Sequence, residues 1–322
     1  MKKVSVLIPV YNVENFVQRC AESIFRQNYD NLDVVFVDDC SPDNSIQRIN
    51  DTLQDYPNRK NQVRIVKHKE NRGLAAARNT GVDAAIGDYL MHVDSDDYLD
   101  EAAISQCVEL LEKEAADVVV FGVNHVYPNK TITNIVNVPQ SKDEYLKLML
   151  SRRTRVNIWG ALYKTELYKK HDIQTIEGAN LGEDYTVTPR LIYYAQKVVE
   201  IQKPLYYYIH YNDNSYTYRF SYKSVISHID ILKLLRSFFH DKNDGCFMKS
   251  IDYGETMLKG TAVLKWALTD NDSQYLEMIK NSFTTYNVNV PLPKKIILFL
   301  SDYPFLLKIY CRIGFHLKQL LK

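Results

Sequence analysis

Tyr89-Leu90-Met91-His92-Val93-Asp94-Ser95-Asp96-Asp97 is the stretch that says most about the fold, because an apolar run typical of a buried strand ends in three carboxylates. Acidic side chains crowded in one loop repel one another unless a hard cation or several backbone donors share their charge. Magnesium-type sites combine one or two carboxylates with the phosphate groups of a substrate. The stretch therefore predicts a cation site at a strand end, with the residues that hold the phosphate elsewhere in the chain.

The residues around this stretch alternate between strand-like and helix-like segments. Buried strands are predicted at 4–9, 33–37, 63–66, 89–93 and 117–121, and helices at 14–26, 46–53, 73–86 and 101–115. Such alternation predicts an α/β fold with a mainly parallel, Rossmann-like sheet flanked by helices, and with ligands at the carboxyl ends of the strands. We therefore expect the segments 9–12, 38–39, 68–72 and 94–97 to converge on one site.

Two familiar phosphate-binding motifs are absent from the sequence. No G-x-G-x-x-G follows the first predicted strand, and no G-x-x-x-x-G-K-[ST] occurs anywhere. A dinucleotide-dependent oxidoreductase and a P-loop protein both need such a turn to cradle phosphates. A nucleotide must therefore be held in another way.

Composition narrows the class of protein further. The 322 residues are 46% hydrophobic, which supports a substantial core, and 40 Lys and Arg against 39 Asp and Glu give no reason to expect nucleic acid as a partner. Five cysteines without C-x-x-C spacing argue against a zinc cluster and a disulfide framework, and suit a reducing cytoplasm. We interpret residues 4–10 as a strand rather than a signal peptide, and no apolar run approaches the ~18 residues of a membrane-spanning helix.

Four stretches, in order and at predicted strand ends, resemble the glycosyltransferase family 2 domain, which has the GT-A fold. They are VSVLIPVYN (4–12), VDDCSPDNS (37–45), ENRGLAAARN (70–79) and VDSDD (93–97). The resemblance continues more loosely through 159–164, 182–184 and 206–217. It implies a GT-A domain over 1–220, with a nucleotide-sugar-binding half at 1–125 and an acceptor half at 126–220, and a helical C-terminal region follows at 221–322.

The resemblance implies roles for the acidic loop. Asp96 would bind a divalent metal ion, Mn²⁺ or Mg²⁺, and Asp94 would complete the metal shell or contact the donor together with Ser95. Such an ion offsets the negative charge that develops on a leaving diphosphate. The alternative is that these acids only stabilise the start of the helix near Glu101, and Asp97 is the least certain ligand.

The ends of the first two strands would hold the base of the donor. By resemblance, Asp39 accepts a hydrogen bond from uracil, while Pro9 and Tyr11 frame the ring. Cys40 stands where the family usually has glycine, a departure that concerns the turn and not Asp39.

Arg72 and Arg78 belong to the start of the alanine-rich helix. Free backbone N–H groups at this start and the Arg72 guanidinium would face a phosphate or the uridine. Arg78 lies one to two turns further along. It either contacts the donor, as the arginine of the family does, or forms a structural ion pair.

Gly182-Glu183-Asp184 resembles the motif that supplies the general base in this family. An inverting transfer needs a base within hydrogen-bond reach of the acceptor hydroxyl. We predict that Asp184 is this catalytic base, with Glu183 as the second candidate. The alternative for both acids is stabilisation of a helix start.

Trp159 and Tyr163 are candidates for stacking on an acceptor sugar, and core packing is an equal alternative. Ala161 stands where many relatives have lysine, so no acceptor contact carries over at that position. The segment 206–217 resembles one that closes over the diphosphate, although Ile209 replaces a common arginine. Alternating burial in a strand also explains its tyrosines.

Residues 294–322 form a basic, apolar tail with six Lys and Arg against one acid, Asp302. Apolar faces with flanking basic residues are typical of a helix in a membrane interface, attracted to anionic lipid. A helical pair packed on the catalytic domain explains the pattern nearly as well.

The sequence thus predicts an inverting, metal-dependent glycosyltransferase that moves a sugar from a UDP-sugar to a saccharide acceptor, lipid-linked, in surface polysaccharide biosynthesis. It would be cytoplasmic or peripheral at the inner face of the plasma membrane. Two other classes stay open. A sugar-nucleotide nucleotidyltransferase would need a glycine-rich, basic loop after the first strand, and residues 9–14 contain none. A non-catalytic nucleotide-sugar-binding protein would not need Asp94, Asp96 and Asp184, so their presence argues against it.

Overall fold

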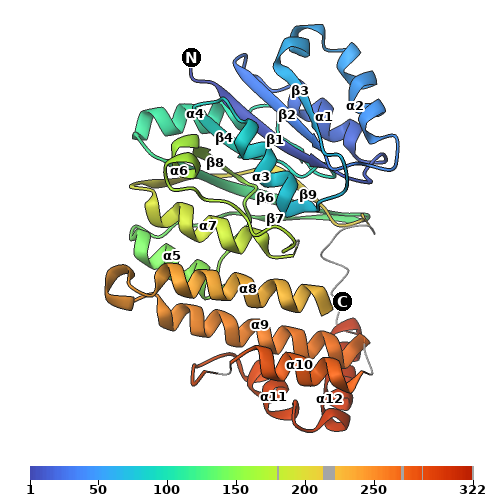
Figure 1. Cartoon of the computed structure of the whole chain (residues 1–322), viewed down its shortest axis with the longest axis vertical. Coiled ribbons are helices and arrows are strands. Elements are labelled where there is room, and N and C mark those ends of the chain that lie inside the picture. The colour runs from blue at the N-terminus through green and yellow to red at the C-terminus, as the bar shows by residue number, and fades with distance from the viewer. Residues whose placement is uncertain (180, 213–221, 270–271, 285, 321–322) are drawn as a thin grey trace. The chain divides into compact units, whose positions relative to one another are not determined.

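The chain forms two compact units in the computed structural model, which describes residues 1–179, 181–212, 222–269, 272–284 and 286–320. The first unit comprises Met1–Leu146 with Val156–Tyr218, and the second comprises Lys147–Arg155 with Arg219–Lys322 (Figure 1). The elements up to the end of the first unit are, in order, β1 (Val4–Val10), α1 (Val17–Phe25), β2 (Leu32–Asp38), α2 (Ser45–Gln54), the 3-10 helix η1 (Pro57–Gln62), β3 (Val63–Lys67), α3 (Leu74–Ala84), β4 (Tyr89–His92), β5 (Tyr98–Leu99), α4 (Ala103–Glu114), β6 (Val118–Tyr127), β7 (Lys130–Asn134), α5 (Lys142–Leu150), β8 (Ala161–Lys164), α6 (Thr165–Lys170), α7 (Glu183–Tyr194) and β9 (Val198–Ile209).

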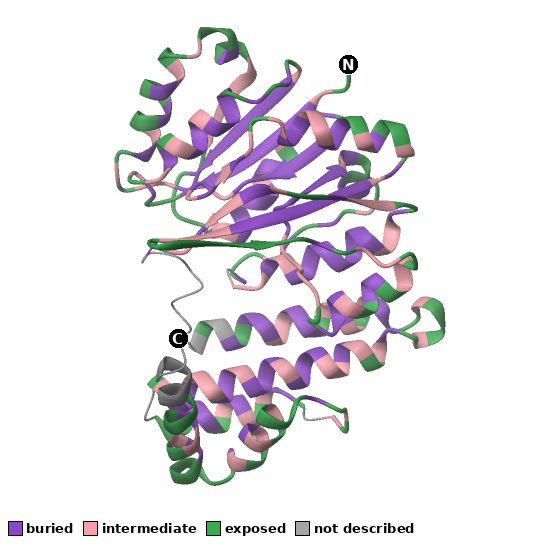
Figure 2. Cartoon of the chain, turned by 180° about the vertical axis from the view of Figure 1, so that it is seen from behind, coloured by how far each residue is buried: buried purple, intermediate pink, exposed green. Residues whose placement is uncertain are grey.

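One mixed sheet organises the first unit, and most of its strand residues are buried (Figure 2). The strand order is β3-β2-β1-β4-β8-β6-β9-β5, and β7 pairs with β6. Strands β1 to β4 pair in parallel, β8 is antiparallel to both β4 and β6, and β9 is parallel to β6. The carboxyl ends of β1 to β4, β6 and β9 therefore lie at the same edge of the sheet.

The predicted α/β fold with flanking helices is confirmed, but the parallel part of the sheet is shorter than the alternation predicted. The strand predicted at 117–121 is the first half of β6. It does not pair with β4, because β8 from later in the chain lies between them. Periodicity along the chain identifies strands but does not show where a later strand inserts.

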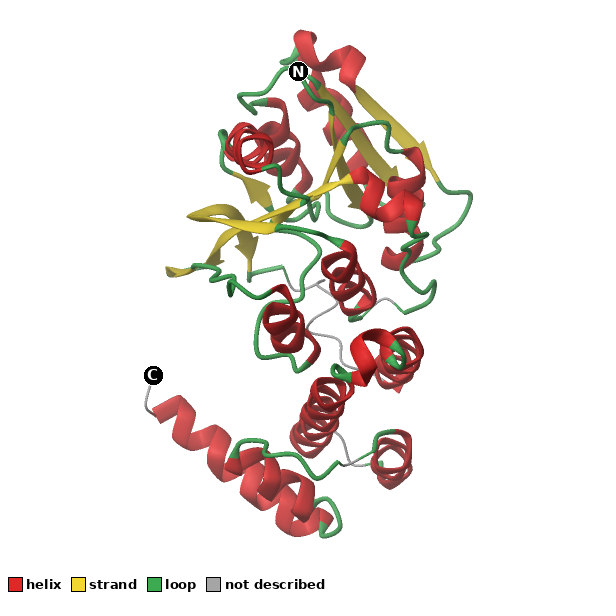
Figure 3. Cartoon of the chain, turned by 90° about the vertical axis from the view of Figure 1, so that its left-hand side faces the viewer, coloured by secondary structure: helices red, strands yellow, loops and turns green. Residues whose placement is uncertain are grey.

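The secondary-structure elements described in the second unit are helices joined by loops (Figure 3). Its elements are α8 (Tyr222–Phe239), the 3-10 helix η3 (Lys242–Gly245), α9 (Met248–Thr269), α10 (Ser273–Ser282), α11 (Leu292–Leu300) and α12 (Pro304–Leu320). Helix α9 is central, since α8, α10, α11 and α12 all pack against it. In the described parts of the chain no helix is both long and apolar enough to cross a bilayer.

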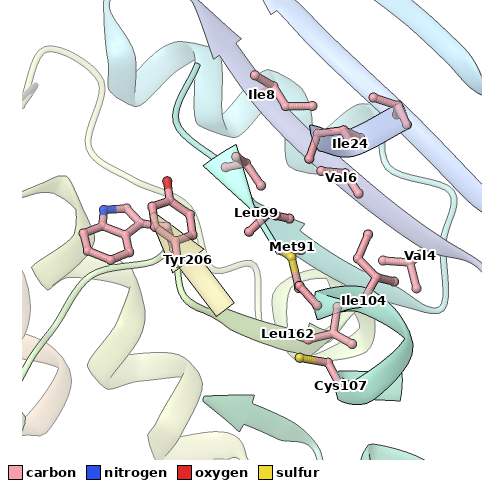
Figure 4. Packing of buried hydrophobic residues seen from close by; sticks show 14 of the residues in the cluster. Val4, Val6, Ile8, Ile24, Met91, Leu99, Ile104, Cys107, Leu162 and Tyr206 are labelled. Carbon is pink, nitrogen blue, oxygen red and sulfur yellow. The ribbon is translucent and has the colours of Figure 1, made fainter. Parts of the chain in front are cut away.

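Strand β1 is buried along its whole length, so both of its faces must be covered. On one face, Val6 and Ile8 pack in a core cluster with Ile24 of α1 and Ile104 of α4 (Figure 4). On the other face α3 approaches closely at Gly81, where a Cβ atom would lie 3.3 Å from the Leu7 Cβ. These helices hold the carboxyl edge of the sheet in place, and the predicted site residues lie at that edge.

Candidate active site

The acidic loop follows β4 at the carboxyl edge and turns back on itself. The Asp97 N–H donates to the Asp94 carbonyl oxygen (3.0 Å), which makes the turn. Ser95 and Asp97 are buried, whereas Asp94 and Asp96 keep part of their surface exposed. Alternate residues of the loop thus face in opposite directions, and Asp94 and Asp96 are the pair that can meet a ligand.

Asp97 holds strand β9 beneath the loop. It is fully buried, and its Oδ2 accepts a hydrogen bond from the Tyr206 hydroxyl (2.8 Å) while its Oδ1 accepts one from the Ile209 N–H (2.8 Å). The Tyr206 oxygen in turn accepts from the Asp94 N–H (3.0 Å). Burial, followed by the charge of Asp96, raises the pKa of Asp97 well above its ordinary value. Both oxygens of Asp97 serve the fold.

Asp96 contacts one residue that follows β9 and one of α1. The Asn212 Nδ2 donates to Asp96 Oδ2 (2.8 Å), and Arg19 Nη2 donates to the Asp96 carbonyl oxygen (3.4 Å). Burial and then the charge of Asp94 raise the pKa of Asp96 to about 6. Among the described residues no group of three or more His, Cys, Asp or Glu could hold a metal ion alone. Two carboxylates suffice for Mg²⁺-type ions when phosphates supply other ligands.

Arg78 of α3 is the centre of a buried ion network. Its guanidinium is 2% exposed and lies 2.9 Å from Asp94 Oδ1, 3.2 Å from Glu183 Oε1 and 3.9 Å from Asp184 Oδ1. Burial alone would lower the pKa of Arg78, but the charges of Asp94, Asp184 and Glu183 raise it above its ordinary value. The ion pair, one of the two roles predicted for Arg78, is present in the structure. The same arginine joins the acidic loop to the predicted base.

Glu183 and Asp184 open helix α7 directly after Gly182, whose φ of 86° is in the left-handed region that favours glycine. Burial, then the charge of Asp184, raises the pKa of Glu183 to about 8, although Arg78 opposes the shift. Burial also raises the pKa of Asp184 to about 6, again against the effect of Arg78. Asp184 Oδ1 is buried and has no hydrogen-bond partner within the described part of the chain, while Asn157 Nδ2 lies 3.5 Å from Oδ2. The described residues therefore leave a hydrogen-bond position on Oδ1 unused, although Arg78 Nη2 lies 3.9 Å away.

Asp39 ties the ends of β2 and β3 to the start of α3. Its Oδ1 lies 2.6 Å from His68 Nδ1 and accepts from the Arg72 N–H (2.8 Å), and its Oδ2 accepts from the Gly73 N–H (2.7 Å). A carboxylate offers about four acceptor positions. Three are used here, so the position left for a base such as uracil is on Oδ2.

Arg72, Pro9 and Tyr11, the other predicted donor contacts, differ in how far they are exposed. The Arg72 guanidinium pairs with Glu177 (2.6 Å), with side chains 43% and 52% exposed, so in this structure only the backbone of Arg72 serves the site. Pro9 is buried within β1, whereas the Tyr11 ring is 41% exposed. Tyr11 is thus the one of the two that offers a face to a ligand.

The backbone conformation of Cys40 explains why the family usually has glycine at this position, after the aspartate pair. Its φ is 58°, in the left-handed region that glycine enters without steric cost. The turn after β2 therefore keeps its shape with cysteine, under local backbone strain.

Trp159 and Tyr163 are core residues in this structure. Trp159 is 4% exposed and stacks on Tyr206 and Tyr208, with ring centroids 4.6 and 5.2 Å away. Tyr163 is 1% exposed and packs edge-on against Tyr168. Their burial favours core packing, the alternative to acceptor stacking.

Several residues of the site were not singled out from the sequence. Asn157 contacts the predicted base, and Arg19 and Asn212 contact Asp96. Their one signal was proximity to motifs, since Asn157 shortly precedes Trp159 and Asn212 lies in the tyrosine-rich segment. Residues 213–217 of that segment lie outside the described residues.

An α/β sheet with charged residues gathered at its carboxyl edge defines the broad class of nucleotide-binding α/β proteins. Within this class, residues 5–171 match the family model Glycosyl transferase family 2. The match spans more than half of the 322 residues, and the chain belongs to this family.

Known proteins agree with this assignment. The chain is 31% identical over 222 residues to the uncharacterized glycosyltransferase EpsJ of Bacillus subtilis, a match that covers 66% of this chain and 62% of EpsJ. It is 27% identical over 214 residues to the poly(ribitol-phosphate) beta-N-acetylglucosaminyltransferase TarS of Staphylococcus aureus, covering 65% of this chain and 35% of TarS. The matched regions thus span less than two thirds of either relative.

Solved structures show the fold independently. TarS residues 1–349 in complex with UDP-GlcNAc superpose with a TM-score of 0.66 at 19% identity, covering 96% of this chain and 89% of that one. The mannosyltransferase PcManGT of Pyrobaculum calidifontis, in complex with GDP-Man and Mn²⁺, gives a TM-score of 0.57 at 16% identity, with coverage of 97% and 86%. The fold is therefore that of GT-A glycosyltransferases with a helical C-terminal region.

Proposed function

We propose that the protein is an inverting, metal-dependent glycosyltransferase that moves a sugar from a UDP-sugar to a hydroxyl group of a saccharide acceptor. The observation that carries the proposal is the position of Arg78 between Asp94 of the acidic loop and the Glu183–Asp184 pair. Direct displacement needs a base on the acceptor side of the anomeric carbon and charge stabilisation on the diphosphate side. The two sides meet at this arginine.

Asp184 would act as the general base. With a pKa of about 6 it is ionised at neutral pH, and its buried Oδ1, 3.9 Å from Arg78 Nη2, accepts no hydrogen bond from the described residues. The acceptor oxygen attacks the anomeric carbon, the bond from that carbon to the diphosphate oxygen breaks, and the hydroxyl proton passes to Asp184 as UDP leaves. Glu183, with a pKa of about 8, stays protonated at neutral pH and is the weaker candidate.

Asp96 and Asp94 would hold a divalent ion, Mn²⁺ or Mg²⁺. Both offer hard oxygen ligands, and the raised pKa of Asp96 reflects burial together with the negative charge of Asp94, which a cation would offset. When bound, the ion would stabilise the charge on the leaving diphosphate. The manganese in the PcManGT complex supports a divalent ion without selecting one.

The donor would be a UDP-sugar. Asp39 keeps one acceptor position on Oδ2, which suits an imide N–H of uracil. The exposed Tyr11 ring lies in the loop after β1, the strand that pairs with β2. The UDP-GlcNAc complex of TarS supports this choice, and the GDP-Man complex of PcManGT makes GDP-sugar the competing donor.

The acceptor would be a lipid-linked saccharide of a surface polysaccharide. Support comes from TarS, which is named a poly(ribitol-phosphate) beta-N-acetylglucosaminyltransferase. The resemblance to glycosyltransferase family 2 also supports it. We place the enzyme in the cytoplasm, at the inner face of the plasma membrane. All five cysteines are free thiols, which suits a reducing compartment.

A donor screen tests this function without knowledge of the acceptor. UDP release is measured from UDP-Glc, UDP-Gal, UDP-GlcNAc and UDP-GalNAc with Mn²⁺ or Mg²⁺. GDP-Man serves as the control for the choice of nucleobase. Slow hydrolysis of one UDP-sugar that stops with chelator is expected. Pyrophosphate formation from UTP and a sugar phosphate would indicate a nucleotidyltransferase instead, and tight donor binding without any turnover would indicate a non-catalytic protein.

A further inference from the structure

Helices α11 and α12 present large apolar side chains to solvent. Their exposed fractions run from 42% for Ile309 to 76% for Phe305, and this group, called the apolar face below, consists of Leu292, Phe299, Phe305, Leu306, Ile309 and Ile313. Figure 2 shows these helices with many exposed residues. Exposed apolar side chains gathered on neighbouring helices mark an interaction surface more often than scattered single ones do.

The apolar face is separate from the face that packs the fold. In α12, Leu307 and Cys311 are buried, and α12 packs against α9. Phe305, Ile309 and Ile313 recur every four residues and so form a second apolar stripe along the same helix. Packing within the second unit uses the first stripe and leaves the second one exposed.

Basic groups border the apolar face. Lys295 and Arg312 are exposed, and Asp302, the one acid in residues 294–322, pairs with Lys280 (2.8 Å). Lys295 also lines a pocket of about 620 Å³ that Phe299 of the apolar face borders, together with the Lys280–Asp302 pair. Apolar insertion and positive charge therefore occur together on one side of the helical unit.

We propose that the apolar face docks on a bilayer that contains anionic phospholipid. The side chains of Phe305, Ile309 and Ile313 enter the interfacial region, and Lys295 and Arg312 approach the phosphate headgroups. Apolar area and basic charge together are what binding to an anionic interface requires. A symmetric contact with a second copy would instead bring two basic faces together, which like-charge repulsion disfavours.

Vesicle sedimentation of the full chain tests the proposal, and its readout does not depend on sugar transfer. The chain is mixed with phosphatidylcholine vesicles with and without phosphatidylglycerol. Phe305→Ser combined with Ile309→Ser should lower the partition coefficient on anionic vesicles about tenfold or more, since two apolar side chains no longer insert. Ile86→Ser, at a 66% exposed position in the first unit, is the matched control and should bind as wild type.

Charge is tested in the same assay. Lys295→Glu with Arg312→Glu should reduce binding to anionic vesicles by a similar factor, whereas Lys113→Glu on the exposed surface of α4 should not. An unchanged melting temperature shows that each variant is folded. The proposal is overturned if wild type sediments equally with neutral vesicles, if the serine variant binds as wild type, or if the apolar face instead holds a dimer that dissociates on the same substitutions.

Discussion

The carboxyl edge of the sheet and the apolar face of α11 and α12 depart from the ordinary distribution of side chains in opposite ways. At the edge, Arg78, Glu183 and Asp97 are ionisable residues in the interior, and on the helices Phe299 and Phe305 are apolar residues in solvent. Both placements are unfavourable in isolation. The buried groups have ion-pair or hydrogen-bond partners within the chain. The side chains of the apolar face are left exposed by the described residues. The carboxyl edge is thus stabilised by contacts within the chain, whereas the apolar face would have to be covered by another molecule.

Removing Arg78 should have the largest effect. Arg78→Met leaves Asp94, Glu183 and Asp184 without the cation that faces them, and breaking a buried ion network by one partner costs about 3–5 kcal/mol of unfolding free energy. Urea unfolding at neutral pH measures the loss, and Arg78→Lys should restore part of it. If Arg78→Met is as stable as wild type, the carboxylates need no internal counter-charge and the contrast drawn above fails.

A matched pair of leucines in α12 separates the two faces of that helix. Leu307 is fully buried and Leu306 is 51% exposed. Leu307→Ala should lower the unfolding free energy by about 2–5 kcal/mol, because it removes core contacts and leaves a cavity. Leu306→Ala should change it by less than about 0.5 kcal/mol. Equal losses in thermal or urea unfolding would mean that both stripes pack inside the fold.

Stability should fall as pH rises, because several carboxylates at the edge have raised pKa values. Asp96 and Asp184 are raised from 3.8 to about 6, and Glu183 from 4.5 to about 8. Between these limits the folded chain binds more protons than the unfolded chain, so their stabilisation is complete below about pH 4 and is lost as pH rises through 6 and 8. Urea unfolding without added metal should show a continuous loss of stability between about pH 5.5 and 8.5. A stability that increases over this window would contradict the burial of these groups.

The smallest expected change concerns backbone strain beside Asp39. Cys40→Gly should raise the unfolding free energy by about 0.5 kcal/mol, since the gain at a φ of 58° exceeds the added freedom of the unfolded chain. Ala115→Gly, at the end of α4 with a φ of 48°, is the matched control and should gain similarly. A loss of stability at Cys40 alone would show that its side chain contributes contacts.

The sequence sufficed for the strands and helices whose periodicity is local, and for the acidic loop that ends β4. It did not show that β8 inserts between β4 and β6, because strand order depends on contacts distant in sequence. For the same reason the link from Arg78 on α3 to Glu183 on α7, 105 residues later, could not be derived from spacing. The sequence left acceptor stacking and core packing open for Trp159, because an aromatic residue fits a core and a sugar equally well, and its burial favours core packing.

The most direct test of the central claim compares UDP binding and sugar transfer in Asp184→Asn and Asp96→Asn. Titration calorimetry with UDP and Mn²⁺ measures binding, and UDP release from the preferred donor measures transfer. Asp184→Asn should bind UDP as wild type does and lose transfer by at least about a hundredfold, since it removes only the base. Asp96→Asn should lose the metal-dependent part of UDP binding. Transfer that persists in Asp184→Asn would contradict the account.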